Sequence, residues 1–149
     1  MYDVPCGPER VAFDTSQLVH VQPPLEWATN WPDRAQGLPV SMDGTDDGPY
    51  GVLVELAELV LPKIDALAAA SNKYLHSWID VRAQFFEGDW KLRSLRLPWE
   101  GLTGPLRGIV FELTLSIRED DYGEWSVRWK HHTFPRNVFV PYAFSRRQW

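Results

Sequence analysis

The spacing of apolar residues along the chain changes twice. The first 50 residues show little periodicity, and from Val52 to Leu67 the apolar positions then recur every three or four residues. This spacing places them on one face of a helix. Pro62 interrupts the pattern, because proline removes a backbone hydrogen bond and clashes with the carbonyl four residues earlier. We therefore predict one kinked helix or two short abutting helices, with Asp47 or Gly48 as the N-terminal cap.

Beyond Lys73 the period becomes two, which is typical of strands with one buried face. Residues 78–85 alternate between apolar and polar positions, residues 109–118 do so without a break, and residues 125–132 return after a turn. Between these stretches, Leu92 is out of phase with Leu95 by one residue, which predicts a β-bulge near Arg93 and Ser94.

A helical unit followed by an antiparallel meander predicts an α+β fold. We expect one kinked helix, or two short helices, packed on a four- to five-stranded antiparallel sheet. Residues 1–50 hold seven of the twelve prolines, so we expect a largely irregular N-terminal arm that packs on the unit formed by residues 51–149. The chain, 1–149, is then a single domain. Its predicted core is Leu53, Leu56, Val60, Ile79, Val81, Phe85, Phe111, Leu113, Leu115, Val127 and Trp129.

Composition narrows the class of protein. A chain of 149 residues that is 44% apolar and 23% charged is long enough to bury a core without a disulfide or metal. Cys6 is the only cysteine, which excludes an internal disulfide and a cysteine-based zinc cluster. The start of the chain lacks the pattern of a signal peptide, and the apolar stretch from Gly51 to Pro62 is too short to cross a membrane. We expect a cytoplasmic protein with no membrane contact, cofactor or metal.

His131 and His132 raise the question of a metal or acid–base site. Adjacent residues on a strand point to opposite faces, so these two side chains cannot share one metal ion. Matching the apolar faces of the last hairpin places Leu113 opposite His131 and Glu112 opposite His132. His131 is then a hydrogen-bonded structural residue on the core side. His132 forms an ordinary cross-strand pair with Glu112, or, as the alternative, an acid–base couple.

The sequence carries no recognised catalytic signature. It has no nucleophile elbow, phosphate-binding glycine loop, dinucleotide fingerprint or His-Glu-x-x-His motif. The acidic stretch that begins at Asp43 departs from a calcium loop, because Val54 stands where the loop needs a glutamate. Catalytic groups often meet only in space, so the question of an enzyme stays open, and we lean towards a non-enzymatic protein.

The outward positions of the predicted sheet form a candidate partner-binding surface. Its members are Trp78, Arg82, Lys91, Arg93, Glu112, Arg118, Arg128, Lys130 and His132. Residues 1–47 carry eight acids against Arg10 and Arg34, which gives −6, whereas the rest of the chain sums to +1. Three interpretations remain open: a solvated face, a face covered by the acidic N-terminal arm with Trp27 and Trp31, and a docking surface for an acidic partner.

Three functions follow from these features. The first is a small soluble protein-binding module, of the toxin-neutralising or assembly type. A helix followed by a Trp-rich antiparallel meander is similar, at the level of the fold, to small bacterial toxin-neutralising (immunity) proteins. The second is a small-ligand-binding protein or hydrolase, with a pocket lined by Trp90, Trp129 and His131. The third is single-stranded RNA binding on the outer sheet face, which the acidic net charge of −5 disfavours. A homodimer through a sheet edge is also open.

Overall fold

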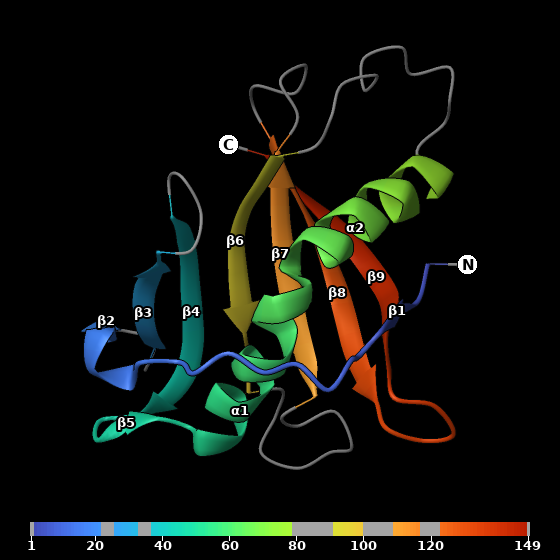
Figure 1. Cartoon of the computed structure of the whole chain (residues 1–149). Helices are drawn as coiled ribbons and strands as arrows, with labels where there is room; N and C mark the ends of the chain where they lie inside the picture. Colours follow the sequence, from blue (N-terminus) through green and yellow to red (C-terminus); the bar gives the residue numbers. More distant parts are fainter. Residues whose placement is uncertain are drawn as a thin grey trace.

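A computed structural model describes residues 2–21, 26–32, 37–78, 91–99, 109–116 and 123–148. They form a nine-stranded sheet with one helical run lying across it (Figure 1). The strands are β1 (Val4–Pro5), β2 (Val19–Val21), β3 (Glu26–Trp31), β4 (Leu38–Thr45), β5 (Gly48–Pro49), β6 (Lys91–Leu97), β7 (Val110–Ser116), β8 (Gly123–His132) and β9 (Val138–Gln148). The helical run consists of α1 (Gly51–Val60), a 3-10 turn (Leu61–Lys63) and α2 (Ile64–Trp78). The chain thus combines helix and sheet, as its sequence predicts.

The sheet is larger than predicted and it is mixed. Its strand order is β1-β9-β8-β7-β6-β4-β3-β2, and β5 pairs with β4. Strands β4 and β6 are parallel, with Val40 opposite Leu95. Parallel neighbours need a crossover connection, and the helical run between them lies on the chain segment that makes it. The prediction of a four- to five-stranded antiparallel sheet is therefore wrong. The similarity to toxin-neutralising proteins stays a prediction.

Strands also occupy the region that was expected to be an irregular arm. The first 50 residues contain β1 to β5. In β4, Leu38, Val40 and Met42 are buried and alternate with more exposed residues, which is the pattern of a strand with one buried face. Pro39 obscures this pattern in the sequence, yet it is the second residue of the strand, where proline costs little pairing.

The helical run spans 28 residues without a break, so the alternative of two short helices is wrong. Pro62 lies in the 3-10 turn, and because it has no N–H, the carbonyl of Glu58 four residues earlier accepts the N–H of Val11 instead. Tyr50, rather than Asp47 or Gly48, precedes the helix, and it makes no side-chain capping bond. The alanine-rich stretch after Ile64 favours helix strongly, and it carries the helix on to Trp78, which was predicted to begin a strand.

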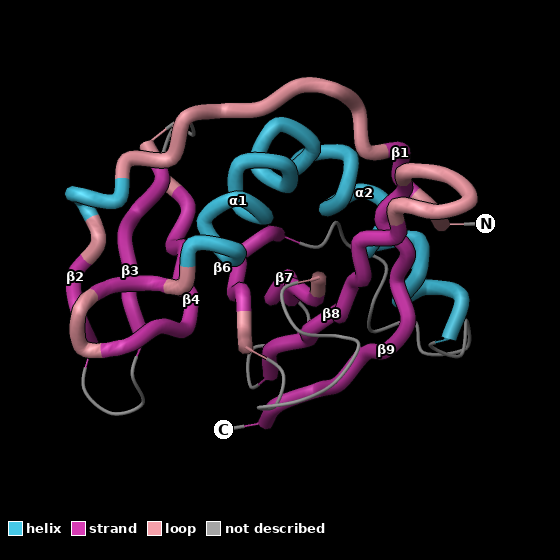
Figure 2. The backbone as a smooth tube through the Cα atoms, turned by 90° about the horizontal axis from the view of Figure 1, so that it is seen from below, coloured by secondary structure: helices cyan, strands magenta, loops and turns pink. Residues whose placement is uncertain are grey.

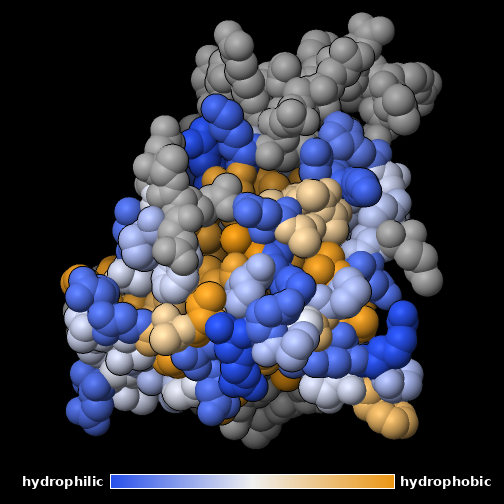
Figure 3. Space-filling model, viewed as in Figure 1, coloured by the Kyte–Doolittle hydropathy of each residue, from blue (hydrophilic) through white to orange (hydrophobic). Residues whose placement is uncertain are grey.

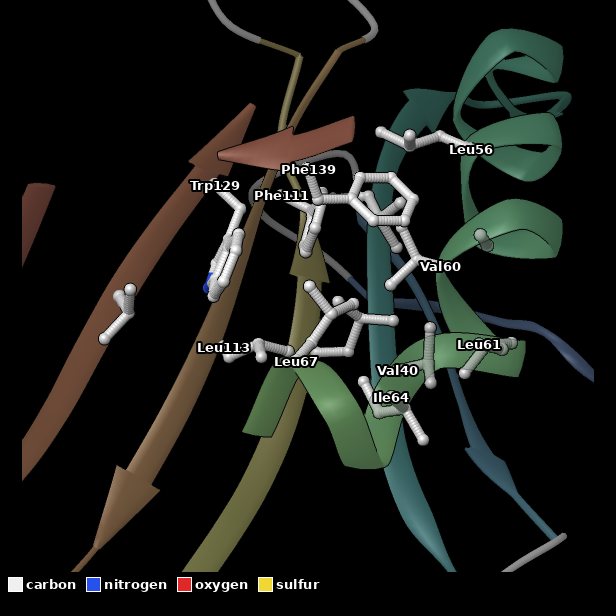
Figure 4. Packing of buried hydrophobic residues seen from close by; sticks show 14 of the residues in the cluster. Val40, Leu56, Val60, Leu61, Ile64, Leu67, Phe111, Leu113, Trp129 and Phe139 are labelled. Carbon is white, nitrogen blue, oxygen red and sulfur yellow. The ribbon is translucent and has the colours of Figure 1, made fainter. Parts of the chain in front are cut away.

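The core lies between the helical run and the sheet. The predicted core residues in the described ranges are all buried, namely Leu53, Leu56, Val60, Phe111, Leu113, Leu115, Val127 and Trp129, whereas Ile79, Val81 and Phe85 lie outside these ranges. Figure 4 shows Trp129 and Phe111 on neighbouring strands, facing side chains of the helix. The rings of Phe111 and Trp129 are stacked at 6.3 Å, and Phe139 meets Phe111 edge-on at 5.4 Å.

One buried hydrogen bond crosses the interface between helix and sheet. The indole N–H of Trp129 donates to the hydroxyl of Ser71 at 3.0 Å, and both residues are fully buried. A buried donor must find an acceptor, because water cannot reach it. Ser71 is thus the polar residue that lets a tryptophan occupy the centre of the core.

The N-terminal segment forms a further layer over the helix. Figure 2 shows it crossing the helical run on the side away from the sheet. The N–H of Val11 donates to the carbonyl of Glu58 at 3.2 Å, and the N–H of Phe13 donates to the carboxylate of the same residue at 3.2 Å. Lys63 and Glu9 add an ion pair at 3.3 Å. Residues 2–18 therefore do not cover the face of the sheet that points away from the helix.

We predict that Ser71→Ala lowers the free energy of unfolding by about 1–3 kcal/mol, because the N–H of Trp129 is left buried without its acceptor. Urea denaturation measures this loss. Ser77→Ala is the matched control, since its exposed hydroxyl donates to the carbonyl of Tyr74 on the same helix, and we expect a change within about 0.5 kcal/mol. Equal effects of the two variants would contradict the structural role of Ser71.

Candidate functional site

The outer face consists of the side chains that β6 to β9 direct away from the helix. Its orientation follows from their neighbours Leu95, Leu113 and Val127, which are fully buried on the other side. By register, the charged members are Lys91, Arg93, Arg96, Glu112, Glu124, Arg128, Lys130 and Arg147. Six cations against two acids give this face +4 in a chain of −5.

Two of these cations, Arg128 and Arg96, form ion pairs with acidic side chains. Glu112 of β7 lies in register between Arg96 of β6 and Arg128 of β8. The guanidinium of Arg128 donates to the carboxylate of Glu112 at 3.1 Å, and Arg96 lies 3.6 Å from the carboxylate of Asp43 on β4. The same Asp43 accepts the N–H of Trp99 at 2.7 Å. These contacts fix one row of charges across four strands.

The other four cations form no ion pair with an acid that the structure describes. Arg93 donates to the hydroxyl of Ser116, and the ammonium of Lys130 lies 4.5 Å above the ring of Tyr142. Lys91 is exposed, and Arg147 lies opposite Glu124 in the register. The predicted β-bulge between Leu92 and Ser94 is confirmed, and it places Arg93 outside the regular pairing of β6 with β7.

A row of hydroxyl groups runs beside the charged row. Ser94, Thr114, Ser126 and Ser145 occupy matching positions on β6, β7, β8 and β9. The oxygens of Thr114 and Ser126 lie 3.3 Å apart. Each hydroxyl is both donor and acceptor, so this row offers short-range hydrogen bonds next to long-range charge.

Strand β9 is only partly covered at its outer edge. It has eleven residues, and within the described chain β1 pairs with Val138 and Phe139 alone. Pro141 and a bulge opposite Arg128 and Trp129 break the regularity of the strand, and Arg147 adds charge near its end. Proline, bulges and charge are the usual devices that protect an edge from uncontrolled pairing. The homodimer through a sheet edge stays a prediction.

Trp78 lies away from the outer face on which it was predicted. It ends α2, is 63% exposed, and lies 6.0 Å from Phe144 on the helix side of β9. Tyr74 contacts both rings edge-on, and Trp125 lies 6.2 Å from Phe144. The displacement has a simple cause: α2 continues to Trp78, so the predicted strand does not begin there.

The histidines occupy the predicted faces but not the predicted register. Leu113 lies opposite Val127 and Glu112 opposite Arg128, which is a shift of four residues from the expected pairing. An even shift keeps every side chain on its face, so alternation alone could not detect it. His131 faces the inner side against Phe139 at 5.1 Å, whereas His132 is exposed and pairs with β9. The predicted pair of Glu112 with His132 is therefore wrong.

Cys6, His131 and Asn137 meet where β1 joins the β8–β9 hairpin. The ring nitrogen Nε2 of His131 lies 2.6 Å from the amide oxygen of Asn137, whose amide nitrogen donates to the carbonyl of Cys6 at 3.3 Å. The asparagine stands between the other two, so the histidine is not placed to deprotonate the thiol. Burial raises the pKa of the Cys6 thiol. This arrangement fastens the N-terminal segment to the sheet and does not activate a nucleophile.

A cavity of about 360 Å³ lies between the N-terminal segment and β3. It is lined by Ala12, Phe13, Asp14, Gln17, Thr29, Asn30, Trp31 and Pro32. The rings of Phe13 and Trp31 are parallel, with an interplanar angle of 6° and centroids 5.8 Å apart. No sequence pattern predicts this site, because its two halves lie on separate segments that share no motif.

The remaining predicted residues fall into two groups. Arg82, Trp90 and Arg118 lie outside the described residues. Trp129 is enclosed in the core and His131 is bonded to Asn137, and neither lines the cavity above. The predicted pocket around Trp90 stays a prediction.

The described part of the chain shows neither a candidate metal-binding group nor a helix that could span a membrane. There, no group of three or more His, Cys, Asp and Glu side chains is close enough to hold a metal ion. Its helices include none with the length and apolar character needed to span a bilayer. The cytoplasmic location stays a prediction.

The raised pKa of Cys6 predicts a pH-dependent stability. A thiol that holds its proton more tightly when folded contributes stability that is present below the ordinary pKa of 9.0 and is lost as the pH rises above it. We expect the free energy of unfolding to fall more steeply above pH 9.0 in the unmodified protein than in Cys6→Ala. Urea denaturation on both sides of that pH measures the difference, and parallel profiles would contradict the burial of the thiol.

Comparison of the chain with protein-family models, with curated proteins and with solved structures gave no match. The outer face and the cavity are therefore the two features from which we infer a function.

Proposed function

We propose that this protein is a protein-binding module whose outer face docks an acidic partner. The observation that carries the proposal is the set of four cations, Lys91, Arg93, Lys130 and Arg147, that form no ion pair with a described acid. They stand beside a row of hydroxyl groups on the face that the helix and the N-terminal segment leave uncovered.

The chemistry of this face favours carboxylates. A guanidinium presents its N–H groups in a plane that matches a carboxylate, and hydrogen bonds between charged groups are about twice as strong as neutral ones. Complementary charges also speed the encounter and orient it. The chain as a whole is acidic, so the excess of cations on the outer face distinguishes this face from the average surface for an acidic partner.

Single-stranded RNA is the weaker candidate for the same face. Sheets that bind RNA stack bases on aromatic side chains, and among the described outward residues of β6 to β9 the aromatic rings are those of His132 and Tyr142. The ring of Tyr142 lies under the ammonium of Lys130. Trp78, which was predicted to lie on this face, ends α2 instead.

The test is capture of the partner from the cells that make the protein. The tagged chain is compared with the double variant Arg93→Glu and Lys130→Glu, and co-eluting proteins are identified by mass spectrometry. The matched control is Arg10→Glu with Lys73→Glu, which changes the net charge equally at exposed positions on the N-terminal segment and α2.

We expect one stoichiometric acidic protein, with the outer-face variant reducing its capture about tenfold or more and the control leaving it unchanged. Circular dichroism checks that both variants are folded. Capture that is equal in all three proteins, a basic partner, or a complex that ribonuclease dissolves would contradict the proposal.

A further inference from the structure

The cavity beside Phe13 and Trp31 is a second candidate site, and it is independent of the outer face. Figure 3 views the molecule from the side of the N-terminal segment and the helix, and hydrophobic side chains remain visible there among hydrophilic ones. The cavity has two walls. One belongs to the segment from Ala12 to Gln17, and the other to β3 and the residue after it.

Phe13 and Trp31, which together form the aromatic wall of the cavity, are each held in place by hydrogen bonds of their own backbone. Trp31 ends β3 and pairs with Leu38 of β4, so its backbone is part of the sheet. Phe13 is buried, and its N–H donates to the carboxylate of Glu58 on α1. The parallel rings therefore form a preformed surface, and a ligand that stacks on it pays little ordering cost.

Asp14 supplies a negative charge next to this wall. One of its carboxylate oxygens, Oδ1, accepts both the N–H of Ser16 at 3.0 Å and the hydroxyl of Ser16 at 2.6 Å. The hydroxyl and then the backbone N–H of Ser16 hold the pKa of Asp14 below its usual value. Both of these bonds go to Oδ1, and a side-chain hydrogen bond from Gln17 adds to the lowering of the pKa of Asp14. No described cation pairs with this carboxylate.

The other residues that line the cavity limit the charge of the ligand that it can bind. Among the described residues that line the cavity there is no basic side chain, so none of these residues balances the charge of an anionic ligand. Gln17, Thr29 and Asn30 are neutral and offer both donors and acceptors. The first 47 residues carry a net charge of −6, which draws cations towards this part of the chain.

We infer that this cavity binds an organic cation, and specifically a guanidinium group, with its N–H groups on the carboxylate of Asp14 and its flat face on the ring of Trp31. A guanidinium is planar, donates two parallel hydrogen bonds to a carboxylate, and stacks on aromatic faces. The cavity volume of about 360 Å³ accommodates such a group with an alkyl chain. The carboxylate and the aromatic wall are thereby used by one ligand.

The test compares two ligands of the same shape. Butylguanidine carries the cation, and butylurea is its neutral analogue. Calorimetric titration should give binding of butylguanidine that is about tenfold or more tighter than that of butylurea, because charged hydrogen bonds are the stronger ones. The same addition should shift the indole N–H signal of Trp31 in an NMR spectrum, assigned with Trp31→Phe.

Two variants locate the charge. Asp14→Asn keeps an oxygen for Ser16 and removes the negative charge, so we expect the affinity for butylguanidine to fall about tenfold. Asp46→Asn removes the same charge from an exposed turn outside the cavity and should leave the affinity unchanged. N-acetylarginine amide, measured alongside, shows whether the cavity accepts the side chain of a peptide as well as a free alkylguanidine.

Several results would overturn the inference. These are equal binding of butylguanidine and butylurea, an equal loss of affinity in Asp46→Asn, and no binding up to about 10 mM ligand. None of them bears on the outer face, so failure here and failure of the proposed partner binding are distinguishable.

Discussion

Trp129 lies where the sheet and the helical run meet, and the packing of the molecule is organised around it. Its ring is stacked on Phe111, and its indole N–H is satisfied by Ser71 of α2. The first contact fixes β8 against β7, and the second fixes the rotation of α2 about its axis. A buried indole without an acceptor would cost about 1–3 kcal/mol, out of the roughly 5–15 kcal/mol that stabilise a typical domain. The burial of one face of the sheet by a single long helix therefore depends on a polar contact as well as on apolar area.

With the helix fixed, the two sides of the molecule acquire different roles. The N-terminal segment binds to the exposed side of the helix through Glu58, and it carries Phe13 and Asp14 to the edge of β3. Its acidic residues are thus kept away from the outer face of β6 to β9, where cations are in excess. The acids of residues 2–18 are thus separated in space from the cations of the outer face, whereas Asp43 on β4 pairs with Arg96. The arrangement gives an outer face with an excess of cations, and a cavity with the carboxylate of Asp14 in its described lining.

Hydrogen bonds between Cys6, Asn137 and His131 hold the start of the N-terminal segment against the sheet. Cys6 and Asn137 exchange backbone and side-chain hydrogen bonds, and Asn137 is in turn bonded to His131. These contacts set the point from which the N-terminal segment crosses the helix. A residue pattern of cysteine, histidine and asparagine is thereby used for position rather than for catalysis, since the thiol is buried and its proton is held more tightly than usual.

The sequence by itself determined which side chains of these strands and of the helix face the core. Period-two alternation identified the buried side chains of β7 and β8, the phase change at Leu92 identified the bulge, and spacing of three and four identified the buried stripe of the helix. These are local properties, because the direction of a side chain follows from its own backbone. Only the tertiary structure decided the register of β7 with β8, the parallel pairing of β4 with β6, and the meeting of Phe13 with Trp31. Each of these joins segments distant in sequence, and an even shift in register leaves every local pattern unchanged.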